Sequence, residues 1–387
     1  MKTAQISITG MASVSPLGAD ATKIWQAYLQ DRSFLKVTEY DSFAVSVGAL
    51  ATEQNDALEV LRNSDPKYKR LDRSVLLALY TSRNALSQVT WDKEFGVNIG
   101  SSRGATALFE NYYDAFQKDP LAKTATLTSP TTTLGNIASW VAHDLQATGP
   151  AISHSITCST ALHALLNGVA WLRSGMSNAF LVGGTEAANT PFTIAQMKAL
   201  KIYAPTSSAS HPCRALDLEK KENTMVLGEG AASFCLERGP VENPLAVIRG
   251  LGYATEILTH NISISSEALC FQKSMQMALE DAGLQTVDAV VMHAPGTIKG
   301  DLSEYKALQA VFGNHLPALT SNKWKIGHTL GASGALSLEL AVLMLQHQQF
   351  IPVPYLSDVE DISTLDTVMV NAVGFGGNAV SILLSKK

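Results

Sequence analysis

The stretch SITCSTALHALLNG, residues 155–168, decides how the rest of the chain is interpreted. Ile156 and its apolar neighbours are typical of the end of a buried strand. From Ser159 onward, leucines recur at helical spacing, and Gly175 is well placed to end the helix. Cys158 is therefore predicted at a strand-to-helix turn, where unpaired N–H groups and the helix dipole favour a thiolate and lower a thiol pKa.

Cys158 taken alone has two explanations. It could be a nucleophile whose helix N-terminus also stabilises a developing oxyanion. It could equally be a small hydrophobe packed at a tight turn, which is the usual role of a free cysteine and the one favoured without further support. The other cysteines (Cys213, Cys235 and Cys270) are far apart and form no CxxC pair. We therefore expect free thiols and no metal site.

The composition sets limits on the class of protein. The chain has 387 residues, of which 46% are hydrophobic and 16% charged, enough for a large core in two domains or one pseudo-duplicated unit. The net charge of −5 without a basic block argues against nucleic acid and anionic lipid. The first residues lack a signal peptide, and the longest apolar helical stretch, 335–345, is short for a membrane span. We expect a soluble cytoplasmic protein without membrane insertion.

Strand-like and helix-like segments alternate along the chain, which predicts an α/β protein with buried sheets. Each half opens with a strand, continues through a loop with a reactive polar residue, and then enters a helix rich in small residues. The segment ERGPVENP, residues 237–244, concentrates charge, glycine and proline between the halves. We therefore place one domain at 1–240 and the other at 241–387. The polar stretch 211–225 is expected to be a surface excursion.

Two of the nine histidines stand apart from the others. His293 follows the apolar run AVVM and precedes a turn, and His328 lies between a lysine-bearing loop and a helix of small residues. Polar residues at the carboxyl ends of buried strands are common in α/β active sites, although a structural role fits either histidine alone. Together with Cys158 they leave two chemistries open, a cysteine hydrolase or acyl transfer to cysteine.

Six segments in order resemble the β-ketoacyl-acyl carrier protein synthases, the condensing enzymes of the thiolase superfamily. They are ISITGMASVSPLG at 6–18, the nucleophile segment at 149–187, MVLGEGAASFCLE at 225–237, HAPGTIKGDLSE at 293–304, KWKIGHTLGASGALS at 323–337 and VGFGGNAVSILL at 373–384. The resemblance implies a thiolase fold, in which two pseudo-duplicated halves form five layers in the order α-β-α-β-α.

The resemblance also implies a role for individual residues. Cys158 would accept the acyl chain, and His293 and His328 would bind the malonyl thioester as neutral imidazoles that each donate one N–H to the enolate oxygen. Lys323 would pair with Glu304 and hold the histidines in place. Phe375 would gate the site and supply a backbone N–H to an oxyanion hole shared with Cys158. The remaining candidates would contact substrate or give the gating loop its freedom: Thr297, Gly374, Gly376 and Gly377.

The resemblance implies an acyltransferase that condenses malonyl-carrier with a Cys158-bound acyl chain. The pathway could be fatty acid synthesis or specialised polyketide or polyene synthesis. No metal or bound cofactor is expected, because the phosphopantetheine arm arrives on acyl carrier protein. A homodimer is expected, or a heterodimer with a related ketosynthase or chain-length factor.

Some features depart from the family pattern. Ala294-Pro295 precede Gly296-Thr297, GFGGNA replaces the usual GFGGTN, and Trp324-Lys325 are bulkier than usual. These departures keep open a non-catalytic subunit of the chain-length-factor type, although such subunits usually lack the cysteine. A thiolase or decarboxylating hydrolase is less favoured, since the C-terminal motif contains no second cysteine.

Overall fold

The computed structural model describes residues 4–40, 43–119, 124–206, 209–258, 264–356 and 364–386. Within these ranges ten strands form one sheet, in the order β10-β9-β11-β12-β8-β1-β7-β6-β4-β5. The N-terminal half of the sheet consists of β1 (Ile6–Val14), β7 (Gly230–Arg238), β6 (Ala179–Glu186), β4 (Gly96–Gly100) and β5 (Ala151–Ile152). The C-terminal half consists of β8 (Ala246–Thr255), β12 (Asn378–Ser385), β11 (Thr367–Gly374), β9 (Ala289–Val291) and β10 (Ala318–Thr320).

The two half-sheets repeat one topology. In the N-terminal half, β1 pairs antiparallel with β7 and β7 with β6, and the parallel pairs β6–β4 and β4–β5 continue to the edge. In the C-terminal half, β8 pairs antiparallel with β12 and β12 with β11, and the parallel pairs β11–β9 and β9–β10 continue to the opposite edge. The halves join where Ile6–Ile8 of β1 pair antiparallel with Ala246–Ile248 of β8. Parallel pairings require crossover helices, and these helices supply the remaining layers.

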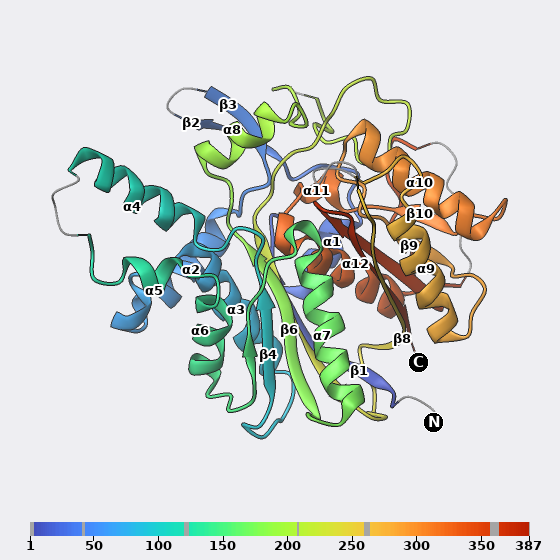
Figure 1. The fold of residues 1–387 in the computed structure, drawn as a ribbon, viewed down its shortest axis with the longest axis horizontal. Coiled ribbons are helices and arrows are strands. Elements are labelled where there is room, and N and C mark those ends of the chain that lie inside the picture. The colour runs from blue at the N-terminus through green and yellow to red at the C-terminus, as the bar shows by residue number, and fades with distance from the viewer. Residues whose placement is uncertain are drawn as a thin grey trace.

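Two helices lie between the half-sheets, α7 (Thr160–Ser174) and α12 (Ser333–His347). α7 packs on β6 and β4, whereas α12 contacts β11 and β9 as well as β7 and β6 (Figure 1). The outer faces are covered by α3 (Arg73–Leu86) and α6 (Asn136–Leu145) in one half and by α9 (Leu269–Ala282) and α10 (Ile298–Phe312) in the other. This arrangement confirms the predicted α/β thiolase fold.

Close packing of the central helices depends on small residues. A Cβ on Gly334 of α12 would lie 2.7 Å from Cγ of Leu162 on α7, so any larger side chain would separate the two helices. The apolar run including α12 extends over Leu330–His347, longer than the stretch 335–345 expected from the sequence. Since 89% of this run is buried inside the protein, it is typical of a core helix.

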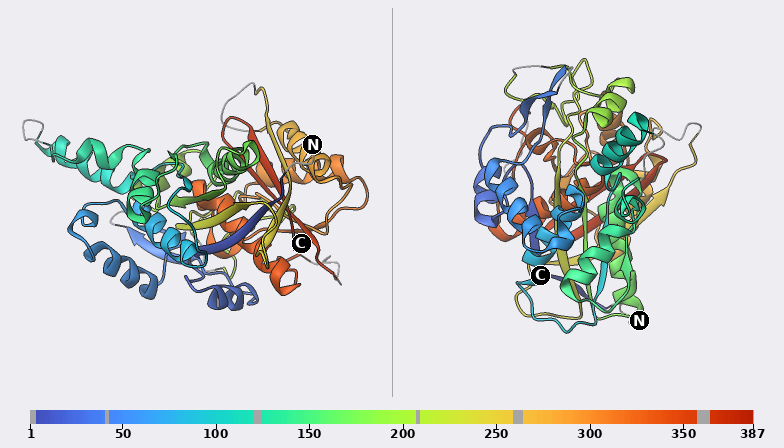
Figure 2. Two further views of the ribbon diagram at one scale, coloured as in Figure 1. Left: turned by 90° about the horizontal axis from the view of Figure 1, so that it is seen from below. Right: turned by 90° about the vertical axis from the view of Figure 1, so that its left-hand side faces the viewer.

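The remaining elements form excursions from this framework. They are α1 (Ala21–Tyr28), β2 (Lys36–Tyr40), β3 (Phe43–Val47), α2 (Thr52–Asn63), α4 (Thr106–Lys118), α5 (Thr128–Thr132), α8 (Pro191–Ala199), α11 (Lys323–Ile326) and the short 3-10 turns η1 (Pro66–Tyr68), η2 (Thr157–Ser159) and η3 (Leu330–Ala332). In both Figure 1 and Figure 2, α4 extends away from the body of the molecule.

The unusual Trp324-Lys325 pair has a structural role in this arrangement. The buried ammonium of Lys325 donates hydrogen bonds to the carbonyl of Ala27 in the last turn of α1 and to the carbonyls of Gln30 and Arg32 just after it. Carbonyls at the C-terminal end of a helix are short of helical donors, so a cation beside them is favourable. The departure from the family pattern therefore anchors the end of α1 to α11, which also carries Lys323.

Candidate active site

The nucleophile segment contains a strained turn. Thr157 has a φ of 47°, which is rare for a β-branched residue, and it immediately precedes Cys158. The turn is held by Thr160, whose hydroxyl donates to the carbonyl of Thr157 at 2.6 Å and accepts from the N–H of Ile156 at 2.9 Å. Cys158 thus lies in the 3-10 turn η2 directly before α7, which ends at Gly175 in a left-handed conformation as predicted.

The first histidine follows a short parallel strand. β9 ends at Val291, and the backbone N–H groups of His293 and Ala294 donate to the Glu304 carboxylate at 2.9 and 2.8 Å. Ala294 has a φ of 20°, so the chain turns sharply immediately after the imidazole. Glu304 therefore fixes the backbone that carries His293.

The second histidine is held by backbone pairing. The N–H of His328 donates to the carbonyl of Val226 at 2.7 Å, and its own carbonyl accepts from Gly228. Leu330, two residues later, has a φ of 42° at the turn η3 that leads into α12. The turn η3 precedes α12 as η2 precedes α7, so the two halves use equivalent strained turns at the site.

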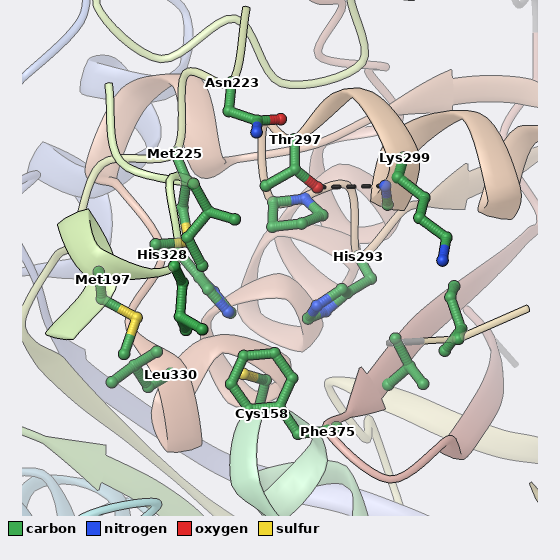
Figure 3. A pocket seen from close by; sticks show the side chains of 17 residues that line it. Cys158, Met197, Asn223, Met225, His293, Thr297, Lys299, His328, Leu330 and Phe375 are labelled. Atoms are coloured by element: carbon green, nitrogen blue, oxygen red, sulfur yellow. Dashed lines mark hydrogen bonds between the residues drawn. The ribbon is translucent and has the colours of Figure 1, made fainter. Parts of the chain in front are cut away.

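One cavity joins these segments. It has a volume of about 1020 Å³ including its open mouth, and Cys158, His293, His328 and Phe375 all line it. Figure 3 shows both imidazole rings directed toward the space above Cys158, with Phe375 beside the sulfur. The ring centroids of His293 and His328 are 5.2 Å apart. The structure therefore brings together residues that are distant in the sequence.

Burial controls the charge of the two histidines. It lowers the pKa of His328 to about 3, and the neighbouring Lys323 ammonium acts in the same direction. The pKa of His293 is also lowered, by burial first and then by His328 and Lys323. Both imidazoles are therefore neutral near pH 7, and each can donate one N–H and accept at its other nitrogen.

The predicted thiolate at Cys158 is wrong for the resting site. Burial raises the pKa of the thiol to about 12, and the nearby Glu186 carboxylate adds to this rise, while Lys323 opposes it. The side chain is only 6% exposed, so loss of solvation outweighs the N–H groups of the turn. The resting residue is a thiol, and its proton must leave as a bond forms to sulfur.

The expected Lys323–Glu304 ion pair is also absent. Lys323 is buried and donates to Ser337 Oγ at 2.9 Å and more weakly to Asn322 Oδ1 at 3.4 Å. The Glu304 carboxylate is already occupied by two backbone N–H groups and by the Asn371 amide at 3.3 Å. The two charges influence each other through space, and burial still lowers the pKa of Lys323 to about 8.

The remaining candidates divide into two groups. Thr297 and Gly374 line the cavity, whereas Gly376 and Gly377 lie in the adjoining turn outside its lining. The Thr297 hydroxyl accepts from the N–H of Gly300 at 3.1 Å and begins α10. Gly376 and Gly377 have φ values of 93° and 72°, which explains the requirement for glycine there.

Several lining residues were not predicted. Met197 of α8, Met225, Asn223 and Lys299 all line the cavity together with Cys158 and the two histidines (Figure 3). Asn223 and Met225 belong to the stretch 211–225 that was expected to be a surface excursion. No motif distinguishes such residues in the sequence, because only the folded chain brings them to the cavity.

Glu186 was also not predicted from the sequence, although its place at the polar end of the apolar run NAFLVGGTEA is a signal that could have identified it. This buried carboxylate accepts from Ser101 Oγ and from the N–H groups of Ser102, Arg103 and Gly331. It therefore ties the loop before α4 to the turn η3. Among the described residues, no group of three or more His, Cys, Asp or Glu side chains has an arrangement that could hold a metal ion.

The fold and the site define a condensing enzyme of the thiolase class. Structures with this fold include a beta-ketoacyl synthase from Burkholderia phymatum STM815, with a TM-score of 0.86, 23% identity, and coverage of 100% of this chain and 99% of that one. A type II PKS acyl-carrier protein in complex with its ketosynthase bound to the hexaketide gives a TM-score of 0.85 at 19% identity, covering 99% and 100%. The ishigamide ketosynthase/chain length factor gives 0.85 at 18%, covering 99% of each chain.

The chain belongs to the beta-ketoacyl synthase family. The model of the N-terminal domain of that family matches residues 3–241, and the model of the C-terminal domain matches residues 245–356. A 3-oxoacyl-[acyl-carrier-protein] synthase 2 from Coxiella burnetii is 30% identical, covering 100% of this chain and 99% of the relative. The enzyme of the same name from Staphylococcus aureus is 27% identical, covering 99% and 98%.

Proposed function

We propose that the protein is a β-ketoacyl-acyl carrier protein synthase that condenses a malonyl thioester with an acyl chain held on Cys158. The observation that carries this proposal is the single cavity lined by Cys158, His293, His328 and Phe375. Cysteine as nucleophile and two neutral histidines as N–H donors account for both halves of such a reaction. The pathway is fatty acid synthesis or specialised polyketide or polyene synthesis.

In the first half-reaction, the Cys158 sulfur attacks the acyl thioester of the carrier protein. A bond forms between sulfur and the acyl carbon, the carbon–sulfur bond to the carrier arm breaks, and the thiol proton is transferred to the departing arm. The backbone N–H groups of Cys158 and Phe375 would bind the tetrahedral oxyanion. The short turn before α7 supports this role, since helix N-termini present unpaired N–H groups.

In the second half-reaction, the malonyl thioester loses CO2, and the electron pair of the broken carbon–carbon bond forms an enolate. Neutral His293 and His328 can each donate one N–H to the enolate oxygen. The enolate carbon then attacks the acyl carbonyl, the bond between that carbon and the Cys158 sulfur breaks, and the sulfur takes up one proton from solvent to regenerate the thiol. Lys323 would act as a positioning residue, with its ammonium keeping both imidazoles neutral.

The acyl chain and the malonyl group would enter on phosphopantetheine attached to acyl carrier protein. Carrier proteins are acidic, and two exposed lysines lie at the cavity or beside it. Lys299 lines the cavity, and the backbone carbonyl of Lys201 accepts from Asn223, which also lines it. We propose that Lys201 and Lys299 contribute to carrier docking and that Thr297 contacts the arm. Replacing Lys201 with Glu should raise KM for the carrier substrate and leave kcat unchanged.

We propose a homodimer in which the first half pairs with its own copy. The helix α4 carries the exposed aromatic residues Phe109, Tyr113 and Phe116 at helical spacing on an arm outside the core. Such an apolar face is typical of an interface. Sedimentation of the double variant Phe109→Glu, Tyr113→Glu should yield monomer. An unchanged sedimentation coefficient would argue for a different interface.

Two further expectations stay proposals. We infer a cytoplasmic location, to be tested by fractionation, and a division into units at 1–240 and 241–387, to be tested by limited proteolysis near residue 240. A non-catalytic chain-length-factor role is not favoured, because Cys158 is present and lines the cavity with both histidines. The same experiment tests it, because such a subunit would give no acyl adduct on Cys158.

The decisive experiment combines the protein with acyl-carrier and malonyl-carrier substrates and follows CO2 and ketoacyl product. Product formation that disappears in Cys158→Ala supports the proposal. The His293 and His328 double variant should trap the acyl group on Cys158, and its mass would identify the preferred chain. A folded protein that yields neither adduct nor product with any chain length would refute the condensation function.

A further inference from the structure

Lys323 belongs to a buried polar cluster whose other members the steps above do not use. Its members come from β1, α1, the start of α11 with the residue before it, and α12, and each is at most 3% exposed. They are Ser13, Tyr28, Asn322, Lys323, Ser337 and Glu339. Polar groups so far from water are costly unless they satisfy one another, so a cluster of six requires an explanation.

The contacts of the cluster run from Lys323 to Glu339. The Lys323 ammonium donates to Ser337 Oγ and Asn322 Oδ1, and Ser337 also donates to Asn322 Oδ1 at 3.4 Å. At the other end, the Ser13 hydroxyl donates to Glu339 Oε1. The buried Tyr28 hydroxyl makes no hydrogen bond of regular geometry, but it is close enough to Asn322 and Glu339 for both to influence its pKa.

Three atoms at the centre of the cluster have no hydrogen bond of regular geometry: Tyr28 OH, Asn322 Nδ2 and Glu339 Oε2. One pattern of donors satisfies all three. An ionised carboxylate only accepts, so Tyr28 would donate its O–H to Glu339 and accept from the Asn322 amide N–H. The Asn322 oxygen is then left to face Lys323, which is the orientation present in the structure.

We propose that Glu339 is a positioning residue for the condensation reaction, acting through Tyr28 and Asn322 to hold the acceptor that stabilises the Lys323 ammonium. This inference rests on the proposed function of the site. It replaces the expected Lys323–Glu304 ion pair with a longer route, in which a carboxylate orients the partners of the lysine without contacting it.

The charge of Lys323 matters to every reacting group. The pKa of the Lys323 ammonium is raised by Glu304 and Asp301 on α10 and by the thiols of Cys158 and Cys213. The ammonium in turn lowers the pKa of His293 and of His328. Ser13 and Tyr28 favour the ionised form of Glu339, and burial opposes them. Burial raises the pKa of Glu339 to about 7, so the carboxylate is ionised in the alkaline range where Lys323, with a pKa of about 8, loses its proton.

The test compares Tyr28→Phe, Glu339→Gln and Ser337→Ala with Ser82→Ala. Ser82 is a matched control, because it is a buried serine on α3 hydrogen-bonded to Ser233, away from this cluster. The decarboxylation rate is measured from pH 6 to pH 9. Loss of a hydrogen-bond acceptor lowers the pKa of a lysine. The pH at which the decarboxylation rate falls on the alkaline side should therefore decrease by roughly half to one pH unit, while the rate at pH 6.5 stays within about threefold.

A purely structural role would lower the rate equally at all pH values, and that outcome, or an unmoved limb, would overturn the inference. If Glu339→Gln does not fold, Tyr28→Phe removes one oxygen atom only and carries the test. Alkylation of Cys158 by iodoacetamide needs no substrate. At pH 8.5 it should slow by about threefold in the variants, since the thiolate loses a neighbouring cation. This readout separates failure of the inference from failure of the proposed function.

Discussion

The imidazole rings of His293 and His328 meet edge to face, with centroids 5.2 Å apart and planes at 86°. Each ring has a buried Nδ1 without a hydrogen-bond partner, and the rings point toward the space above Cys158 (Figure 3). Two neutral donors at this separation can share one oxygen atom. The relationship explains how a site without a metal ligand set among its described residues can stabilise an enolate.

Removal of one donor should affect condensation much more than acyl loading. In His328→Ala, the enolate loses one N–H, and the rate of CO2 release should fall by about 10²- to 10³-fold. Loading of Cys158 should persist, because the first half-reaction uses the N–H groups at the turn. Carbon dioxide release and intact-protein mass together check this expectation, with His315→Ala as a control outside the cavity. Equal loss of both half-reactions would contradict the assigned role.

Replacement of the nucleophile should be specific to one cysteine. Cys158→Ala should abolish the acyl adduct and all ketoacyl product, while Cys270→Ala should retain both. Both thiols are buried, with pKa values raised to about 12, so burial alone does not distinguish them. Only Cys158 lines the cavity. Mass spectrometry after incubation with acyl carrier protein decides the question, and an adduct on Cys270 would contradict our assignment.

The chain immediately before Phe375 should not tolerate a side chain at Gly374. A Cβ there would lie 2.1 Å from Thr157 Oγ1 and 2.5 Å from the carbonyl of Ile156, in the strained turn before Cys158. Gly374→Ala should therefore lower the unfolding free energy by about 1–3 kcal/mol and slow acyl loading. Gly135→Ala is the matched control, because nothing lies within 4 Å of its Cβ position. Urea unfolding measures the free energy of unfolding of both variants. A loss in Gly135→Ala as large as that in Gly374→Ala would refute the steric argument.

Glu339 should make stability depend on pH. Burial raises the pKa of its carboxyl from 4.5 to about 7, so the folded protein binds more protons than the unfolded chain between these values. The protonated Glu339 carboxyl contributes fully to the free energy of unfolding below pH 4.5, and this contribution is lost as the pH rises through 7. Between pH 5 and 7.5, the fall in unfolding free energy should be smaller in Glu339→Gln by roughly 1–3 kcal/mol.

Urea unfolding at several pH values measures this difference. The exposed residue Glu280 provides a control on another helix, and Glu280→Gln should unfold with the pH dependence of the wild-type protein. Parallel curves for Glu339→Gln and wild type would show that the buried carboxyl does not contribute.

Much of the site could be predicted because its residues lie within local motifs. Cys158 before a helix and His293 after a strand follow from short-range periodicity, and the thiolase fold followed from six segments in order. The ionic state of Cys158 could not be predicted this way. The helix N-terminus favours a thiolate, but the depth of burial is a property of the whole fold and outweighs it. The partner of Lys323 was missed for a related reason, since Glu304 is occupied by backbone N–H groups.

The sequence by itself determined the order of strands and helices, the turns that carry Cys158, His293 and His328, and the family. These depend on periodicity, glycine positions and motif spacing, which are local. The tertiary structure alone decided which side chains share the cavity, which charges survive burial, and which polar side chains of β1, α1 and α12 are buried with Lys323. Those outcomes depend on distances and solvation between segments far apart in the chain, and no local pattern encodes them.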